Sequence, residues 1–253
     1  LYISQPSLTN AIHDLEKEMN VEIFHRTNKG IDISKEGEDF LGYARQVLEQ
    51  AAILEDKYKN GSGGKKQFCV STQHYSFAVN AFVDVVQQYD ADRYSFILRE
   101  TQTGEIIDDV SSGRSELGLL YLCESNESVL SKLLRKNELV FEELFTAEPH
   151  VFISRDHPLA ARARITLDEL RPYPYLVFEQ GERNSFYFSE ELLSMLDMPK
   201  TIQVRDRATL FSLVIGLNGF TVSSGIIDPK LNSPSIIARP LDMDGSMRIG
   251  LIR

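Results

Sequence analysis

The spacing of hydrophobic residues divides the chain into three regions. Residues 1–34 carry short apolar stretches between polar turns, which predicts short helices and a β-hairpin. Residues 34–60 place apolar side chains at spacings of three and four, the period of one long helix. From residue 67 onward, short apolar strands alternate with amphipathic helices, which indicates βαβ units around a parallel or mixed sheet. The predicted fold class is therefore α/β.

The helix predicted over residues 34–60 has a continuous apolar seam. Ser34 is suited to cap its amino terminus, and Glu36 and Glu38 in the first turn are favoured by the helix dipole. Self-association into a dimer, or a tetramer built from it, is the simplest way to bury such a seam; packing on the chain's own following domain is the alternative. The glycine-rich run within residues 61–66 is a flexible hinge that detaches the helix, which favours self-association. The seam consists of Gly37, Phe40, Leu41, Ala44, Val47, Leu48, Ala51, Leu54 and Tyr58.

A first helix is predicted over residues 5–16. Ser4 or Gln5 can cap it, and Pro6 is tolerated in the first turn because its missing N–H has no intrahelical acceptor. An apolar stripe on this helix, which we expect to be buried, is formed by Leu8, Ile12 and Leu15. Its opposite face carries side chains that can bond base edges and phosphates, namely Gln5, Ser7, Thr9, Asn10 and His13.

A β-hairpin is predicted to follow this helix. The residues from Val21 to Phe24 supply apolar core, and a polar tip with Gly30 separates them from the alternating residues 31–33. Such a hairpin would carry Arg26, Asn28 and Lys29 towards phosphates as a wing. Composition alone also allows a small helical cap with a solvated polar face.

Charge and composition restrict the function without identifying it. The 253 residues have a net charge of −10, and residues 1–35 hold four Lys or Arg against five carboxylates, so charge alone does not suggest nucleic acid. In the net charge of the chain, the negative charge of a large sensor domain can nevertheless outweigh the charge of a small DNA-binding domain. Two cysteines, Cys69 and Cys123, make no disulfide framework, and the five histidines have no metal-ligand spacing. No apolar run approaches the length of a membrane span, and no signal peptide is visible, so we expect a cytoplasmic protein with no membrane partner.

The amino-terminal segment resembles the LysR-type transcriptional regulators. The resemblance is carried by residues 4–9, Ile12, Leu15, Glu16, Val21, Ile23, Phe24, Arg26, Ile33, Ser34 and Gly37. Asn20 stands where the family usually has glycine, Glu36 replaces the usual alanine, and the chain begins inside the second helix of the motif. The resemblance implies a truncated winged helix-turn-helix over residues 1–34, with its helix in the major groove, and a regulator that binds double-stranded DNA and has RNA polymerase as a candidate partner. The implied DNA contacts are Ser4, Gln5, Pro6, Ser7, Thr9, Asn10, His13, Arg26, Asn28 and Lys29.

Polar residues follow the predicted strands of the region from residue 67. Strands at 68–71 and 94–99 lead into helices, and a third strand spans 117–122. Ligands bind at the carboxyl ends of strands in such sheets, where helix amino termini favour anions. We therefore expect a cleft lined by Thr72, Gln73, Thr101, Gln102 and Thr103, with Tyr121 covering the ligand. His74 is a further candidate, although a solvated histidine at a helix start is the alternative.

The second half of this region looks like the effector domain of the same family, in the segments 156–160, 167–178 and 204–225. The resemblance implies two lobes like those of periplasmic binding proteins, the first over about 67–146 and 247–253 and the second over about 147–246. Strands near 139–145 and 150–154 would cross between the lobes, and the carboxyl-terminal helix expected from the family is missing. Gln180 and Ser223 would face the first lobe across the cleft, and a small anionic effector is expected.

No enzyme motif is visible in the sequence. It has no Gly-x-Ser-x-Gly, phosphate loop or paired dinucleotide glycines, so we expect no catalytic residue, no cofactor and no metal. The run from Arg205 to Arg207 could bind an acidic effector or form a surface charge cluster. A transport-type solute-binding protein is the alternative to a regulator, because a two-lobed domain suits both functions.

Overall fold

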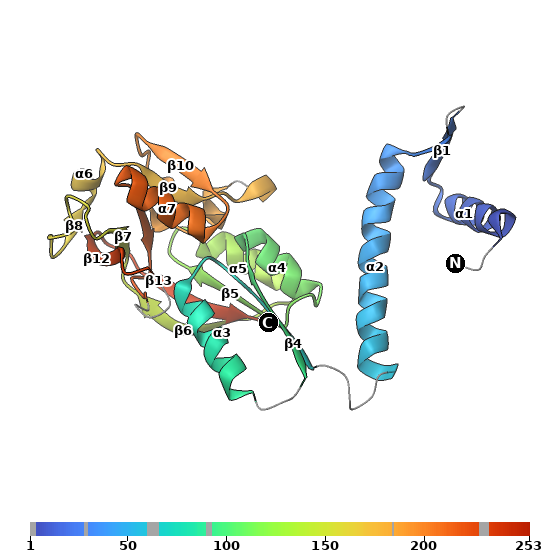
Figure 1. Cartoon of the computed structure of the whole chain (residues 1–253), viewed down its shortest axis with the longest axis horizontal. Helices are drawn as coiled ribbons and strands as arrows, with labels where there is room; N and C mark the ends of the chain where they lie inside the picture. The colour runs from blue at the N-terminus through green and yellow to red at the C-terminus, as the bar shows by residue number, and fades with distance from the viewer. Residues whose placement is uncertain (1–3, 28–29, 60–65, 90–92, 184, 228–232) are drawn as a thin grey trace. The chain divides into compact units, whose positions relative to one another are not determined.

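A computed structural model describes residues 4–27, 30–59, 66–89, 93–183, 185–227 and 233–253. The chain forms two compact units, Leu1–Lys65 in blue to cyan and Lys66–Arg253 in teal to red in Figure 1. Within the described ranges, no helix is both long and apolar enough to cross a membrane.

The amino-terminal unit begins with helix α1 (Gln5–Met19), whose two ends are fixed by side chains and backbone geometry. Ser4 caps the helix by accepting a hydrogen bond from the backbone N–H of Ser7. Asn20 ends it in the left-handed conformation, with φ of 51°, which asparagine adopts more readily than most residues. The Glu16 carboxylate accepts hydrogen bonds from the backbone N–H groups of Ile23 and Phe24, at 2.8 and 3.0 Å, and these bonds lower its pKa. Glu16 thereby ties α1 to the strand that follows.

The predicted hairpin and long helix are both present. Strands β1 (Phe24–Thr27) and β2 (Gly30–Ile33) pair antiparallel, and helix α2 spans Lys35–Lys59. Ser34 caps α2, as predicted, by accepting a hydrogen bond from Gly37 N–H at 2.7 Å. Gly37 lies directly against the backbone of Ile23, where an added Cβ would come within 2.3 Å of the carbonyl oxygen. The start of α2 is therefore packed closely on the turn before the hairpin.

The predicted burial of the α1 stripe is wrong for this structure. Leu8 and Leu15 are 43% and 40% exposed and Ile12 is half-buried, so the stripe is only partly covered within the described unit. Side chains of the α2 seam are also exposed, including Val47 at 68% and Leu54 at 59%. The side chain of Tyr58 lies outside the described residues. Both helices thus leave part of an apolar face exposed, although Phe40, Leu41 and Ala44 near the start of α2 are half-buried.

The carboxy-terminal unit contains two sheets. The first is five-stranded in the order β4-β3-β5-β13-β6, in which β3 is parallel to β4 and β5, while β13 is antiparallel to β5 and β6. Its strands are β3 (Lys66–Thr72), β4 (Tyr94–Glu100), β5 (Leu117–Leu122), β6 (Phe141–Ala147) and β13 (Met247–Ile252). We call this sheet, with helices α3 (Ser76–Gln88), α4 (Thr103–Ser111) and α5 (Glu127–Lys136), the first lobe.

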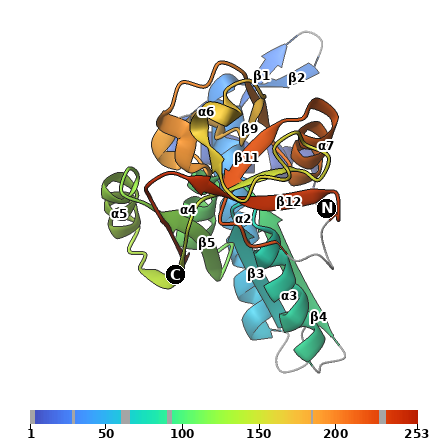
Figure 2. The same cartoon turned by 90° about the vertical axis from the view of Figure 1, so that its left-hand side faces the viewer.

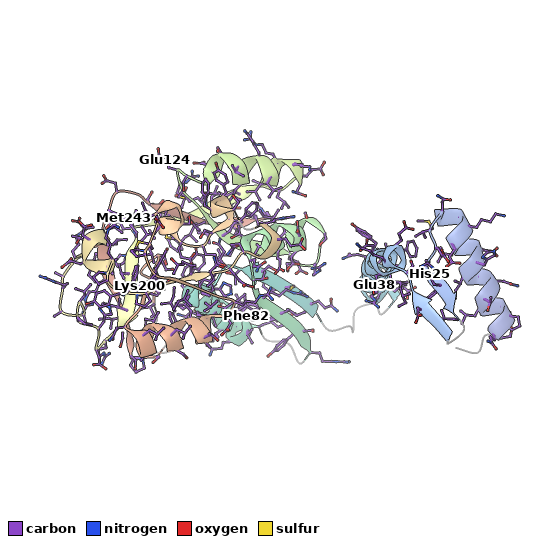
Figure 3. All side chains as sticks on the ribbon, turned by 90° about the horizontal axis from the view of Figure 1, so that it is seen from above. His25, Glu38, Phe82, Glu124, Lys200 and Met243 are labelled. Carbon is purple, nitrogen blue, oxygen red and sulfur yellow. The ribbon has the colours of Figure 1, made fainter. Side chains whose placement is uncertain are left out.

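Alternate residues of β5 face the two cores of the first lobe. Leu120 and Leu122 pack with residues of α4 and α5, whereas Leu119 and Tyr121 pack on the side of α3. Figure 2 shows α3 beside β3 and β4. Phe82 of α3, labelled in Figure 3, makes an edge-to-face contact with Phe96 of β4. Helices therefore lie on both faces of the sheet at β5, whose nearly continuous apolar sequence requires burial on both sides.

The second sheet is six-stranded, in the order β10-β9-β11-β7-β12-β8. Its strands are β7 (His150–Ser154), β8 (Ile165–Thr166), β9 (Tyr175–Phe178), β10 (Thr201–Val204), β11 (Phe220–Ser223) and β12 (Ile236–Asp242). With α6 (Leu167–Leu170), α7 (Arg207–Leu217) and the 3₁₀ turns η1 (Gly181–Arg183), η2 (Phe186–Phe188) and η3 (Leu192–Met195), it forms the second lobe. The chain crosses between the lobes twice, from β6 to β7 and from β12 to β13. The unit is mixed α/β, and the predicted fold class is confirmed.

Candidate functional site

Gln73 and Thr103 join two strand ends of the first lobe. Gln73 follows β3, Thr103 opens α4 after β4, and both side chains are fully buried. Gln73 Nε2 donates to the Thr103 hydroxyl at 2.6 Å, while its Oε1 accepts from the Tyr121 backbone N–H and the Tyr75 hydroxyl, each at 3.1 Å. Both ends of the amide are thus used within the lobe, so Gln73 holds the ends of three strands in register.

Gln180 reaches from the second lobe to the first. Its Oε1 accepts a hydrogen bond from the backbone N–H of Thr103 at 3.1 Å, at the amino terminus of α4. Its Nε2 donates to Glu190 Oε1 at 3.2 Å. Thr103 and Gln180, both predicted to line the cleft, are therefore in direct contact, and a carboxylate lies beside them.

The carboxylate of Glu190 lies at the centre of the contact between the lobes. It accepts a hydrogen bond from the His74 backbone N–H at 2.8 Å, and the His74 ring Nδ1 is 3.0 Å from both of its oxygens. The two side chains are each only 4% exposed. Burial opposes protonation of the ring, but the hydrogen bond and the charge of Glu190 outweigh it and raise the pKa of His74. The His74 ring also stacks on Phe178, with centroids 3.9 Å apart.

Glu191 is a second buried carboxyl group beside the first. It accepts hydrogen bonds from the Phe178 backbone N–H at 2.9 Å and from the Ser189 hydroxyl at 3.0 Å. Burial, reinforced by the charge of Glu190, raises the pKa of Glu191 to about 8. Glu191 is therefore mostly protonated at neutral pH.

The other predicted cleft residues form bonds within the chain. Thr72 donates to the carbonyl oxygen of Gln73 at 2.8 Å, and the Thr101 hydroxyl donates to Glu105 of the following helix. The Gln102 side chain lies against Gly181 of the second lobe, and its buried Nε2 has no hydrogen-bond partner among the described residues. Tyr121, rather than covering an open cleft, is buried and donates from its hydroxyl to the carbonyl oxygen of Ser189 at 3.1 Å.

A small cavity remains between the lobes. His74 and Tyr75 line it from the first lobe, and Ser223 lines it from the second together with Phe152, Phe178, Glu190, Glu191, Arg207, Leu210, Phe211, Thr221 and Val222. Arg207 bridges the lobes through an ion pair with Glu100 at 3.1 Å. The volume that the centre of a water molecule can occupy in this cavity is about 20 Å³. This is enough for about one water molecule.

In the amino-terminal unit, α1 presents the polar face that the sequence predicts. Ser4, Gln5, Pro6, Ser7, Asn10 and His13 are exposed. Thr9 is half-buried and donates to the carbonyl oxygen of Gln5 at 3.0 Å. The side chain of Arg26, and the whole of Asn28 and Lys29, lie outside the described residues. In the described part of the chain, no cluster of three or more His, Cys, Asp and Glu is placed to hold a metal.

Residues 1–38 match the bacterial regulatory helix-turn-helix protein, lysR family, and residues 74–253 match the LysR substrate binding domain. The chain belongs to the LysR family. The resemblance seen in the sequence is thus confirmed, and it covers both units.

Relatives of this LysR-family chain include the uncharacterized HTH-type transcriptional regulator YnfL of Escherichia coli (strain K12), 27% identical over 201 residues, which are 78% of this chain and 63% of YnfL. The RuBisCO operon transcriptional regulator of Allochromatium vinosum is 24% identical over 250 residues, covering 97% and 78% of the two chains. The chain therefore spans less than two thirds of the length of YnfL.

Solved structures of two LysR-like proteins share this fold. Full-length CbnR in complex with its target DNA has a TM-score of 0.65 at 17% identity, covering 99% of this chain and 84% of CbnR. A full-length OxyR variant from Pseudomonas aeruginosa has a TM-score of 0.51 at 20% identity, covering 99% and 80%. At these identities the likeness concerns the fold.

Sequence reasoning missed the two buried carboxyl groups of the LysR-type domain. Glu190 and Glu191 follow no strand end, and they lie between 3₁₀ turns that have no clear periodicity. The available signal was local: two adjacent acidic residues stand between an aromatic run at 186–188 and the apolar residues Leu192 and Leu193.

Proposed function

We propose that the chain is a DNA-binding transcription regulator whose activity is controlled by a small molecule bound between the two lobes. The observation that carries the proposal is the helix-turn-helix match over residues 1–38 together with the exposed polar face of α1. In this proposal, Gln5 and Asn10 read base edges in the major groove, while Arg26 and Lys29 of the hairpin contact phosphates. A helix-turn-helix serves no purpose in a transport-type solute-binding protein, which disfavours that alternative.

The proposed regulator works without catalysis, in the cytoplasm, as a dimer held by the α2 seam. Its effector is a small carboxylate or inorganic oxyanion. Support for an anion comes from the hydrogen-bond donors grouped at the lobe boundary, which are the backbone N–H of His74, the His74 ring and the amide of Gln180. Binding there can alter DNA affinity only if the anion prefers one arrangement of the dimer over another.

The DNA part is tested with the full-length gene product and a sequence selected from random duplexes. Gln5→Ala and Asn10→Ala should reduce the preference for the selected sequence over random DNA, because a base contact contributes about 1–3 kcal/mol of discrimination. Arg26→Ala and Lys29→Ala should weaken binding to both kinds of DNA and reduce the salt slope by about one each. Asp14→Asn, a change in an exposed residue further along α1, is the control. Equal losses for selected and random DNA in the Gln5 and Asn10 variants would contradict the proposed reading face.

A further inference from the structure

The hydrogen-bond donors between the lobes already bind a carboxylate, which is the side chain of Glu190. Glu190 receives hydrogen bonds from the first lobe, through the backbone and ring of His74, and from the second, through Gln180. A carboxylate this deeply buried loses its hydration, so its charge must be compensated by donors of this kind. The three donors therefore constitute a carboxylate-binding site.

The residues before and after Glu190 are both held by hydrogen bonds. The carbonyl oxygen of Ser189 accepts from Tyr121, and the Glu191 carboxyl is bonded to the backbone of Phe178. Seven residues before Glu190, Arg183 of η1 donates to the carbonyl oxygen of Gly104 at 2.9 Å and pairs with Asp108. The segment that carries Glu190 thus lies against both lobes, and its carboxylate is directed at His74.

The space left beside His74 and Glu190 is too small for a second anion. The cavity beside His74 and Glu190 has room for about one water molecule. An effector of several heavy atoms could use the same donors only after the Glu190 side chain has left them.

We propose that Glu190 is an internal occupant of a carboxylate-binding site formed by His74 and Gln180, and that an external carboxylate binds there in competition with it. The inference rests on the proposed function only in taking this cleft as the effector site. Glu190 then keeps the lobes together in the absence of effector. An effector must bind more strongly than a carboxylate that is covalently attached to the chain and therefore has a high local concentration.

Chemical rescue tests the site directly. The atoms removed by Glu190→Ala correspond in composition to acetate. We expect this variant to melt at a lower temperature than wild type, and sodium acetate to raise its melting temperature by a few degrees relative to sodium chloride at the same ionic strength. In calorimetry, acetate should bind the wild-type chain at least about tenfold more weakly than the variant, because Glu190 competes. Adding His74→Ala to Glu190→Ala should abolish the response.

Two controls separate the site from general salt effects. Glu179→Ala removes a more exposed carboxylate, paired with Arg205, and should give no response to acetate. Glu190→Gln keeps the volume filled and should also give none. A response of equal size in Glu179→Ala, or no response in Glu190→Ala, overturns the proposal.

A second measurement covers the case in which Glu190→Ala does not fold. The His74 ring in Glu190→Gln, followed by NMR, should titrate at a lower pH than in wild type, because the carboxylate that favours its protonated form is gone. An unchanged titration contradicts the inference. None of these measurements contains DNA, so the carboxylate site can stand if the regulator proposal fails, and can fail while DNA binding stands.

Discussion

The hydroxyl group of Tyr121 lies 3.1 Å from the carbonyl oxygen of Ser189, to which it donates a hydrogen bond. Tyr121 belongs to β5 in the middle of the first lobe, and Ser189 directly precedes the carboxylate that faces His74. A buried strand of one lobe therefore sets the position of a residue at the boundary with the other.

Tyr121→Phe should lower the free energy of unfolding by about 1–3 kcal/mol, because it leaves a buried carbonyl oxygen without a donor. Urea denaturation followed by circular dichroism measures this. Tyr94→Phe is the control, since Tyr94 is 42% exposed and water can replace any bond of its hydroxyl. If the free energy of unfolding falls by the same amount in the two variants, the Tyr121 hydrogen bond does not stabilise the fold.

Val47→Glu combined with Leu54→Glu should convert the proposed dimer into monomers. Both residues are largely exposed on α2, and a dimer would bury them, so each new charge would be desolvated at a cost of about several kcal/mol. Light scattering at several protein concentrations measures the mass. Arg45→Gln with Ala52→Glu changes the net charge by the same amount on another face of α2 and should leave the mass unchanged. A double Val47 and Leu54 variant that remains dimeric would place the self-association elsewhere in the chain.

Glu191 should make stability fall as pH rises through the neutral range. Its pKa is about 8 in the folded chain and has an ordinary value of 4.5 when exposed, so the folded chain retains a proton that the unfolded chain loses. This stabilising contribution is complete below pH 4.5 and is lost progressively as pH rises to about 8, with a slope of at most about 1.4 kcal/mol per pH unit.

Glu191→Gln isolates this effect, because glutamine keeps the shape of the protonated side chain and does not titrate. The free energy of unfolding of wild type minus that of the variant should decrease between pH 5 and pH 8. The groups that act on Glu191 through their charge or hydrogen bonds are Glu190, Phe178, Ser189 and its own backbone, and these are unchanged in the variant. A difference that is constant with pH would mean that Glu191 is ionised in the folded chain.

Local rules predicted the elements of the fold well. The Ser34 cap follows from the sequence because it depends on residues within one turn of it. Asn20 looked like a departure from the family pattern, and its left-handed φ explains why the change is tolerated. The exposed Leu8 was not predictable, because a periodic stripe indicates which face is apolar and not what covers it.

The candidate site was predicted from both lobes, through Gln73, His74 and Thr103 on the first and Gln180 and Ser223 on the second, but without its two carboxyl groups. The rule that ligands gather at the carboxyl ends of parallel strands led to Gln73, His74 and Thr103, which do lie together. Glu190 was missed because it lies 116 residues after His74, in a segment without regular periodicity, and only the tertiary fold brings the two together. Adjacent glutamates are usually solvated, so their burial here reflects their partners and not their own preference.

Strand β13 has a consequence for how the chain is synthesised. It lies between β5 and β6, yet the ribosome makes it only after the whole of the second lobe. The six strands of the second lobe, from residue 150 to residue 242, are all made between β6 and β13. The inner edges of β5 and β6 must wait, exposing unpaired backbone groups that are open to wrong partners. A ribosome that stalls before residue 247 would therefore release a chain whose first sheet lacks the strand between β5 and β6.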